Sequence, residues 1–225
     1  METREEVAID RQSTFYLEYG KRILDVLGAL AGLMITSPIL GLCAIAIHLE
    51  SPGPIIFRQW RVGQAGDPFQ ILKLRTMVQH ADRQGPKLTG SGDARITRVG
   101  KWLRKTKLDE IPQLLNVLRG EMSLVGPRPE LPEYVVTYSR QQRKLLEFKP
   151  GMTGPASLAF IDEERLLARH PDIESFYVGT ILARKLELDL AYCQMASLVG
   201  DFKLLFRTIL RLFDSTRENR GHTQA

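Results

Sequence analysis

Two adjacent carboxylates, Asp109 and Glu110, are the residues of this 225-residue chain that most directly suggest chemistry. They precede Pro112 and a short helical pattern that ends at Gly120, because proline is tolerated in the first turn of a helix and glycine in the turn after it. Both carboxylates should therefore lie near a helix N-terminus, which favours carboxylates, phosphates and Mg²⁺ bridges between them. Helix capping is the alternative that needs no chemistry.

Arg128 is a candidate phosphate ligand because it lies between Pro127 and Pro129. Each proline restricts its own φ, and Pro129 also favours an extended conformation for Arg128. The planar guanidinium can bind two phosphate oxygens at once. The alternative is a rigid surface turn that carries an arginine.

Two strands are predicted at Ile55–Arg61 and Phe69–Met77, with a loop between them that is too long for a tight turn. The period of two places Lys73 and Arg75 on the same face of the second strand, as a phosphate clamp requires. A solvated strand face is the alternative.

Basic residues also crowd the segment Ile96–Thr106, just before Asp109. They include Arg98, Lys101, Arg104 and Lys105. This positive charge should lower the pKa of both carboxylates and attract anions. The segment lacks the interleaved aromatic residues of a nucleic-acid platform, so we expect no nucleic-acid partner.

The net charge of +5 indicates an anionic partner, and charge alone does not choose among a nucleic acid, an anionic lipid and a phosphorylated substrate. The two cysteines, Cys43 and Cys193, form no Cys-x-x-Cys pattern. A disulfide framework or a zinc site is therefore not expected, and a reducing compartment fits.

The apolar run Ile23–Leu49 is longer than the ~20 residues that a membrane span needs. Ser37 and Pro38 interrupt it, and each half, at roughly 18–23 Å, is shorter than the ~30 Å hydrocarbon core. Basic residues flank both ends, which places both ends in the cytoplasm. We therefore predict a re-entrant helix–break–helix, with a kinked full span as the alternative.

Two further features of this run carry predictions. Asp25 is close enough in sequence to Lys21 and Arg22 for a local ion pair at the membrane surface. Gly28 and Gly32 form a GxxxG pattern, a hint of close helix packing or of a homodimer.

The predicted fold class is α+β and mostly helical, with a small β-hairpin, the helix that carries the carboxylates, and amphipathic interfacial helices. Near the C-terminus, Asp201–Phe213 is amphipathic and suits a membrane interface, with packing against the core as the alternative. The expected division is an N-terminal arm, a re-entrant membrane helix, a catalytic domain and a disordered tail, at residues 1–16, 17–50, 51–213 and 214–225.

Taken together, the motifs resemble those of the bacterial sugar transferases, the small monotopic polyprenyl-phosphate phosphoglycosyl transferases. The resemblance covers about residues 17–213. Its main motifs are Lys21-Arg22-Ile-Leu-Asp25, Ser37-Pro38, Ser51-Pro-Gly-Pro54, Lys73-Leu-Arg75-Thr-Met77, Arg95-Ile-Thr-Arg98-Val-Gly100, Leu108-Asp109-Glu110, Asn116 to Gly120, Met122 to Pro129 and Lys149-Pro-Gly-Met-Thr-Gly154.

The resemblance implies a two-step phosphosugar transfer. Asp109 matches the family nucleophile, which would attack a UDP-sugar, release UMP and pass the phosphosugar to polyprenyl (undecaprenyl) phosphate. Mg²⁺ would bind at Asp109, and Glu110 matches the second family acid. Arg128 would hold a phosphate, with secondary contacts from Lys73, Arg75 and Arg104. The implied location is the bacterial inner membrane, with a monotopic anchor and the catalytic domain on the cytoplasmic face.

A non-catalytic monotopic scaffold that binds anionic lipid is the alternative to an enzyme, but a scaffold has no need of Asp109 and Glu110. After Gly154 the chain departs from many family members, with Pro155–Leu158 and then the acidic Asp162–Glu164. The resemblance therefore does not identify the sugar.

Overall fold

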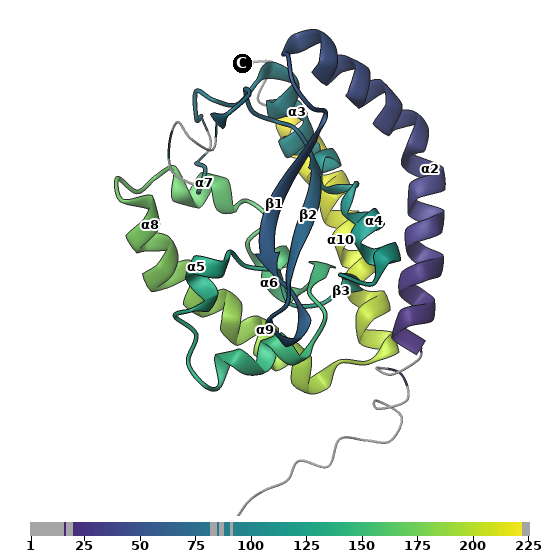
Figure 1. The fold of residues 1–225 in the computed structure, drawn as a ribbon, viewed down its shortest axis with the longest axis vertical. Helices are drawn as coiled ribbons and strands as arrows, with labels where there is room; N and C mark the ends of the chain where they lie inside the picture. The colour runs from purple at the N-terminus through teal and green to yellow at the C-terminus, as the bar shows by residue number, and fades with distance from the viewer. Residues whose placement is uncertain (1–15, 17–19, 82–84, 86–87, 91, 222–225) are drawn as a thin grey trace, which may run out of the picture.

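A computed structural model describes residues 16, 20–81, 85, 88–90 and 92–221, with side chains described as far as residue 212. The fold is mostly helical, as the sequence predicts, and contains two small sheets (Figure 1). The helices are α2 Lys21–Glu50, α3 Arg98–Thr106, α4 Gln113–Arg119, α5 Pro132–Val135, α6 Pro155–Ala159, α7 Glu163–Leu167, α8 Ile173–Phe176, α9 Ala183–Met195 and α10 Leu198–Gly221. Shorter helical turns are η2 Gln64–Gly66, η4 Leu108–Glu110, η5 Gln142–Glu147 and η6 Tyr177–Leu182, the last of them π-helical.

The first sheet is the predicted hairpin, in which β1 (Ile56–Val62) pairs antiparallel with β2 (Pro68–Leu74). The second sheet pairs β3 (Ser123–Val125) in parallel with β4 (Gly151–Thr153), which sequence spacing did not predict. Glycine permits this close approach, because a Cβ on Gly151 would lie 2.1 Å from the nitrogen of Gly126. The pairing brings the start of the Gly-Pro-Arg-Pro corner against the Lys149–Gly154 turn.

Helix α2 is continuous through Pro38, so the predicted break at Ser37 and Pro38 is not present. Proline leaves the carbonyl of Met34 without its backbone donor, and the Ser37 hydroxyl donates to that carbonyl at 3.0 Å. The helix bends instead of breaking, as Figure 1 shows along its upper half. The re-entrant path through the membrane stays a prediction.

Asp25 anchors α2 to the domain instead of forming the predicted local ion pair. Its side chain is buried and accepts hydrogen bonds from the Ser123 hydroxyl (2.9 Å) and the Leu124 N–H (2.8 Å). Lys21 pairs with Asp201 of α10. The prediction failed because the partners of Asp25 come from β3, nearly a hundred residues along the chain.

The GxxxG pattern packs α2 against its own domain. A Cβ on Gly28 would lie 2.5 Å from Cδ1 of Leu124, and one on Gly32 would lie 2.9 Å from Cδ1 of Leu114. The glycines therefore admit side chains of β3 and α4. The homodimer stays a prediction, without support from this motif.

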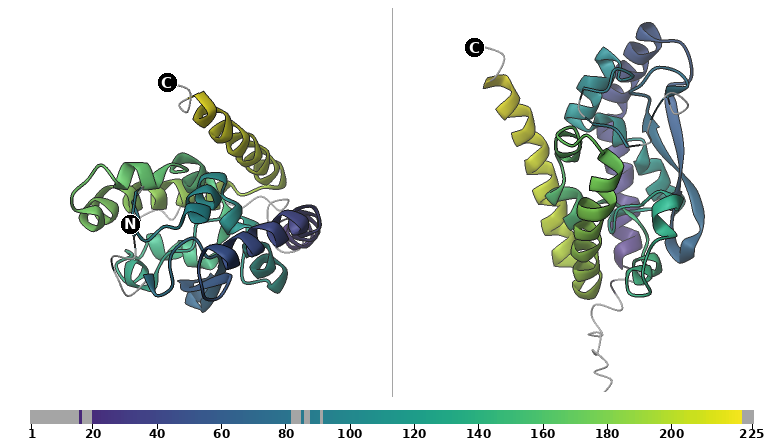
Figure 2. Two further views of the ribbon diagram at one scale, coloured as in Figure 1. Left: turned by 90° about the horizontal axis from the view of Figure 1, so that it is seen from above. Right: turned by 90° about the vertical axis from the view of Figure 1, so that its left-hand side faces the viewer.

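The outer sides of α2 and α10 expose many large apolar residues. They include Ile23, Leu27, Leu30, Met34, Ile35, Leu42, Ile45 and Leu49 on α2, and Phe202, Phe206, Ile209 and Leu210 on α10. Within the described residues, α2 is the one helix long and apolar enough to cross a membrane, which is consistent with membrane association. Figure 2 shows the two helices on different sides of the molecule.

The predicted termini fall largely outside the described residues. Of the arm at residues 1–16, only Tyr16 is described, and it donates a hydrogen bond to Asp201. Helix α10 continues through residues 214–221, where the sequence predicts a disordered tail. The division into domains itself stays a prediction.

Candidate active site

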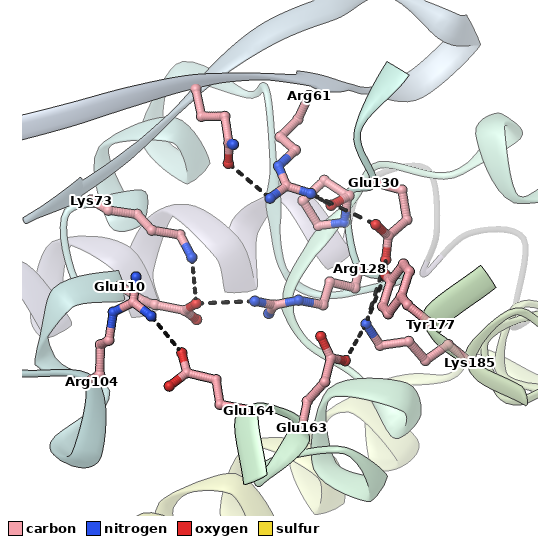
Figure 3. Close-up of polar contacts among 12 residues, drawn as sticks. Arg61, Lys73, Arg104, Glu110, Arg128, Glu130, Glu163, Glu164, Tyr177 and Lys185 are labelled. Carbon is pink, nitrogen blue, oxygen red and sulfur yellow. Dashed lines mark hydrogen bonds and ion pairs between the residues drawn. The ribbon is translucent and has the colours of Figure 1, made fainter. Parts of the chain in front are cut away.

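Asp109 and Glu110 lie in η4, a short turn between α3 and α4 (Figure 3 shows Glu110). Helix α3 ends at Thr106, and its C-cap residue Lys107 has a left-handed backbone (φ 56°) that redirects the chain into this turn. Pro112 then caps α4, and Gly120 ends it with φ 83°. The carboxylates thus precede a helix, as predicted, but in a separate turn that sends their side chains to different surroundings.

Glu110 is held between two cations. Its Oε1 accepts hydrogen bonds from Nζ of Lys73 at 2.8 Å and from Nη2 of Arg128 at 3.1 Å (Figure 3). Burial by itself would raise the pKa of Glu110, but the charges of Lys73, Arg128 and Lys107 outweigh it and hold the pKa well below its usual range. Glu110 is therefore ionised and fixes both cationic side chains at the site.

Asp109 has the opposite electrostatic setting. It is buried, and its Oδ1 has no hydrogen-bond partner among the described residues. Burial, together with repulsion from Glu110, raises the pKa of Asp109 to about 6. The expectation that nearby basic residues lower the pKa of both carboxylates is therefore wrong for Asp109, because desolvation outweighs the charges of Lys73, Lys107 and Arg104.

Arg128 is oriented by a residue that sequence reasoning missed. Its backbone N–H donates to Oδ2 of Asp189 at 3.0 Å, and the N–H of Ala156 donates to Oδ1 of the same carboxylate at 3.2 Å. Asp189 is a buried residue of α9, so one side chain joins the Gly-Pro-Arg-Pro corner to the start of α6. Its partners are distant in sequence, so no local pattern marked it.

Arg75 and Lys73, the two residues of the predicted clamp, have different hydrogen-bond partners. The Arg75 guanidinium donates to the carbonyls of Ser51 (2.6 Å) and Pro52 (2.8 Å), which secures the chain just after α2. Of these two residues, Lys73 is the one that pairs with Glu110. Both side chains line the cavity described below, and their joint role as a phosphate clamp stays a prediction.

Arg104 lies at the edge of the site. Its Nε donates to the Thr76 hydroxyl at 2.9 Å, and its Nη1 pairs with Oε1 of Glu164 at 3.0 Å. It also contributes to the charge around Asp109. Its predicted role as a phosphate contact stays a prediction.

A cavity of about 1090 Å³ opens beside these residues. Its polar lining includes Lys73, Arg104, Asp109, Glu110, Arg128, Glu163, Glu164 and Lys185, and its apolar lining includes Leu124, Met152, Leu158, Leu205 and Leu212. The volume is at the upper end of small-molecule sites. The cavity therefore has room for a nucleotide sugar next to the carboxylate pair.

A second buried charge network borders this cavity. Lys185 of α9 is 3% exposed and contacts Glu163 (2.6 Å), Glu130 (3.6 Å) and the Tyr177 hydroxyl (3.2 Å). Arg61 lies 3.7 Å from the other oxygen of Glu130. The sequence did not predict this network, because its members come from separate elements and each is an ordinary surface residue type.

Comparison with known proteins identifies the family of this chain. The family model described as bacterial sugar transferase matches residues 16–215. The chain belongs to the bacterial sugar transferase family.

Several relatives are similar over most of this chain. A UDP-glucose:undecaprenyl-phosphate glucose-1-phosphate transferase of Caulobacter vibrioides is 42% identical over 202 residues, which are 84% of this chain and 68% of that protein. A UDP-N-acetylgalactosamine-undecaprenyl-phosphate N-acetylgalactosaminephosphotransferase of Aeromonas hydrophila is 37% identical, over 84% of this chain and 42% of its own length. An uncharacterised sugar transferase of Bacillus subtilis is 35% identical, over 87% of this chain and 88% of its own length.

The site of this bacterial sugar transferase fits a Mg²⁺ ion shared with a substrate. The described residues contain no group of three or more His, Cys, Asp or Glu side chains that could hold a metal. Mg²⁺ commonly binds one or two carboxylates and takes its other ligands from substrate phosphates and water. The unpartnered Oδ1 of Asp109 suits that arrangement, whereas Glu110 is already engaged by two cations.

Proposed function

We propose that this bacterial sugar transferase moves a phosphosugar from a UDP-sugar to undecaprenyl phosphate and releases UMP. The names of its relatives describe this general reaction. The structural observation that carries the proposal is the buried, unpartnered oxygen of Asp109 beside a Glu110 that holds Lys73 and Arg128. Asp109 thus offers a carboxylate oxygen to a substrate, while the cations held by Glu110 can bind its phosphate groups.

The proposed reaction has two displacements at one phosphorus atom. Asp109 attacks the β-phosphorus of the UDP-sugar, a bond from carboxylate oxygen to phosphorus forms, and the bond to the bridging oxygen breaks as UMP leaves. An oxygen of undecaprenyl phosphate then attacks the same phosphorus, and the Asp109 carboxylate is released. The product is an undecaprenyl-diphosphate sugar. Two steps avoid an encounter of three bodies at a membrane surface.

The residues around Asp109 support these roles. Its burial makes the carboxylate more basic than usual, so it is a better nucleophile once ionised. Lys73 and Arg128 bind and neutralise phosphate oxygens, and Glu110 keeps both cations pointed at the reacting group. Mg²⁺, held through Asp109 and the diphosphate, would reduce the repulsion between the two anions.

The packing of α2 supports a monotopic anchor. Its proposed place in the bacterial inner membrane, with the catalytic domain on the cytoplasmic face, rests on the family resemblance and on the basic residues that flank both ends of the apolar run. Ala29 of the first half packs in a core with α4 and β3, and Cys43 and Ile47 of the second half pack with Leu103 of α3. A straight span would draw these packed elements into the bilayer. A helix that enters one leaflet and returns keeps the domain at the interface, where the lipid phosphate lies.

Turnover is tested by measuring UMP release from a panel of UDP-sugars, with purified protein in nanodiscs, Mg²⁺ and undecaprenyl phosphate. We expect lipid-dependent UMP release that Asp109→Asn and chelation by EDTA both abolish, with Mg²⁺ restoring the chelated enzyme. Release of UDP instead would mean that the sugar moves without its phosphate. No release with any donor would favour the lipid-binding scaffold.

The covalent step has its own test. Without undecaprenyl phosphate, intact mass spectrometry should show one phosphosugar added per chain, and Asp109→Asn should show none. Turnover without any adduct, even after rapid quenching, would indicate direct transfer.

Membrane topology can be tested by single-cysteine labelling. With Cys43 and Cys193 replaced, cysteines at Asp10 and at the exposed Trp60 should be labelled from the same side of the membrane. Labelling from opposite sides would refute the re-entrant path.

A further inference from the structure

The cavity is lined by carboxylates as well as by cations. Glu110, next to Asp109 in the chain, pairs there with Lys73 and Arg128, the cations suited to a diphosphate. Glu163 and Glu164, in the first turn of α7, line the same cavity (Figure 3). Carboxylates repel a diphosphate, so these two suit a part of the nucleotide sugar other than its phosphates.

Both carboxylates are held in place by cations on other elements. Glu163 forms a 2.6 Å ion pair through Oε2 with Lys185, which is itself buried. Glu164 pairs through Oε1 with Arg104 at 3.0 Å. The side chains are 24% and 38% exposed, so they are fixed without being closed off from the cavity.

Each carboxylate pairs through one oxygen, and both residues line the cavity. The other oxygen of Glu163, Oε1, makes no hydrogen bond among the described residues. Ionised carboxylates accept hydrogen bonds and cannot donate them. They therefore suit the hydroxyl groups of a sugar and disfavour another carboxylate.

Glu163 also lies within electrostatic reach of the phosphate-binding end. The pKa of Arg128 is raised mainly by Glu110, and the charge of Glu163 adds to this effect. A sugar attached to a phosphate at Arg128 would thus lie within reach of α7.

We propose that Glu163 and Glu164 form the sugar-recognition wall of the cavity, which accepts the hydroxyls of neutral hexose donors and rejects uronic-acid donors by charge repulsion. This assignment rests on the proposed transfer from a UDP-sugar. It gives Lys185 and Arg104 positioning roles, since they orient the two carboxylates. It also gives a role to the acidic segment Asp162–Glu164, where the sequence differs from that of many family members.

The test compares UDP-glucose with UDP-glucuronic acid, which differ only in a hydroxymethyl group or a carboxylate at C6. Dissociation constants are measured by calorimetry in nanodiscs, with Asp109→Asn in every protein to prevent turnover. We expect the parent protein to bind UDP-glucuronic acid at least about tenfold more weakly than UDP-glucose. The double substitution Glu163→Gln and Glu164→Gln should reduce this ratio of dissociation constants about tenfold.

Glutamine keeps the shape and one oxygen acceptor, and Lys185 retains Glu130 at 3.6 Å, so folding should survive. Glu187→Gln, at an exposed residue of α9 that pairs with Arg184, is the matched control and should leave the ratio unchanged. A purely structural role for Glu163 and Glu164 would weaken both ligands equally.

Two results would overturn the assignment: equal binding of both ligands by the parent protein, or a ratio unchanged in the glutamine variants. Failure of the proposed function is seen separately, as absence of UMP release from the enzyme with its native Asp109. The two failures are therefore distinguishable.

Discussion

Replacing Asp109 by asparagine should make the protein inactive and, relative to wild type, increasingly more stable as the pH rises. Burial raises the pKa of Asp109 from 3.8 to about 6, so ionisation of this carboxyl is disfavoured in the folded protein. Ionisation of Asp109 therefore lowers the free energy of unfolding. This effect is absent below pH 3.8 and fully present above about pH 6. A shift of about two pKa units corresponds to about 3 kcal/mol of unfolding free energy at pH 7.5.

The pH dependence separates this effect from others. The amide introduced by Asp109→Asn lacks its own buried partner, which could cost about 1–3 kcal/mol, but that penalty does not vary with pH. At pH 5, the same linkage relation leaves about 1.6 kcal/mol of the ionisation cost. The stability of the variant relative to wild type should therefore rise by about 1.4 kcal/mol between pH 5 and pH 7.5.

The assay is thermal unfolding in detergent with EDTA present, at pH 5 and pH 7.5. For a domain of this size, about 1.4 kcal/mol corresponds to a change of roughly 3–6 °C in the Tm difference. Asp67→Asn, at an exposed carboxyl in the hairpin loop, is the control and should show a much smaller pH dependence. A Tm difference that stays constant, or that falls as pH rises, would refute the argument that Asp109 is desolvated.

Three further substitutions test the positioning of the site. Arg128→Lys keeps the charge but loses the planar guanidinium, so kcat/KM for the UDP-sugar, measured from UMP release, should fall about tenfold or more. An unchanged value would exclude a contact in which Arg128 binds two phosphate oxygens at once. Gly151→Ala places a methyl group 2.1 Å from the nitrogen of Gly126 and should cost about 3 kcal/mol in chemical unfolding, whereas Gly41→Ala, which meets nothing within 4 Å, should not destabilise. Asp25→Ala leaves the buried Leu124 N–H unpaired and should cost about 2–3 kcal/mol in the same assay; a cost near zero would mean that α2 is held without this anchor.

Several features followed from the sequence because they depend on near neighbours in the chain. Gly120 ends α4, and the alternating residues of β1 and β2 form the predicted hairpin. The apolar run forms one long helix, since its length and composition are local properties. The effect of Pro38 was overestimated, because the Ser37 hydroxyl supplies a donor that the backbone pattern alone does not show.

The sequence by itself determined the chemical inventory: an adjacent carboxylate pair, a proline-flanked arginine, basic residues around them and a membrane-length apolar helix. Only the tertiary structure decided how these residues divide their roles. Glu110 receives Lys73 and Arg128 while Asp109 stays buried and unpartnered, and Asp189 and Lys185 arrive from α9 to orient the site. The burial of Asp109 and these long-range contacts depend on elements far apart in the chain, so they cannot be predicted from sequence periodicity or motif spacing.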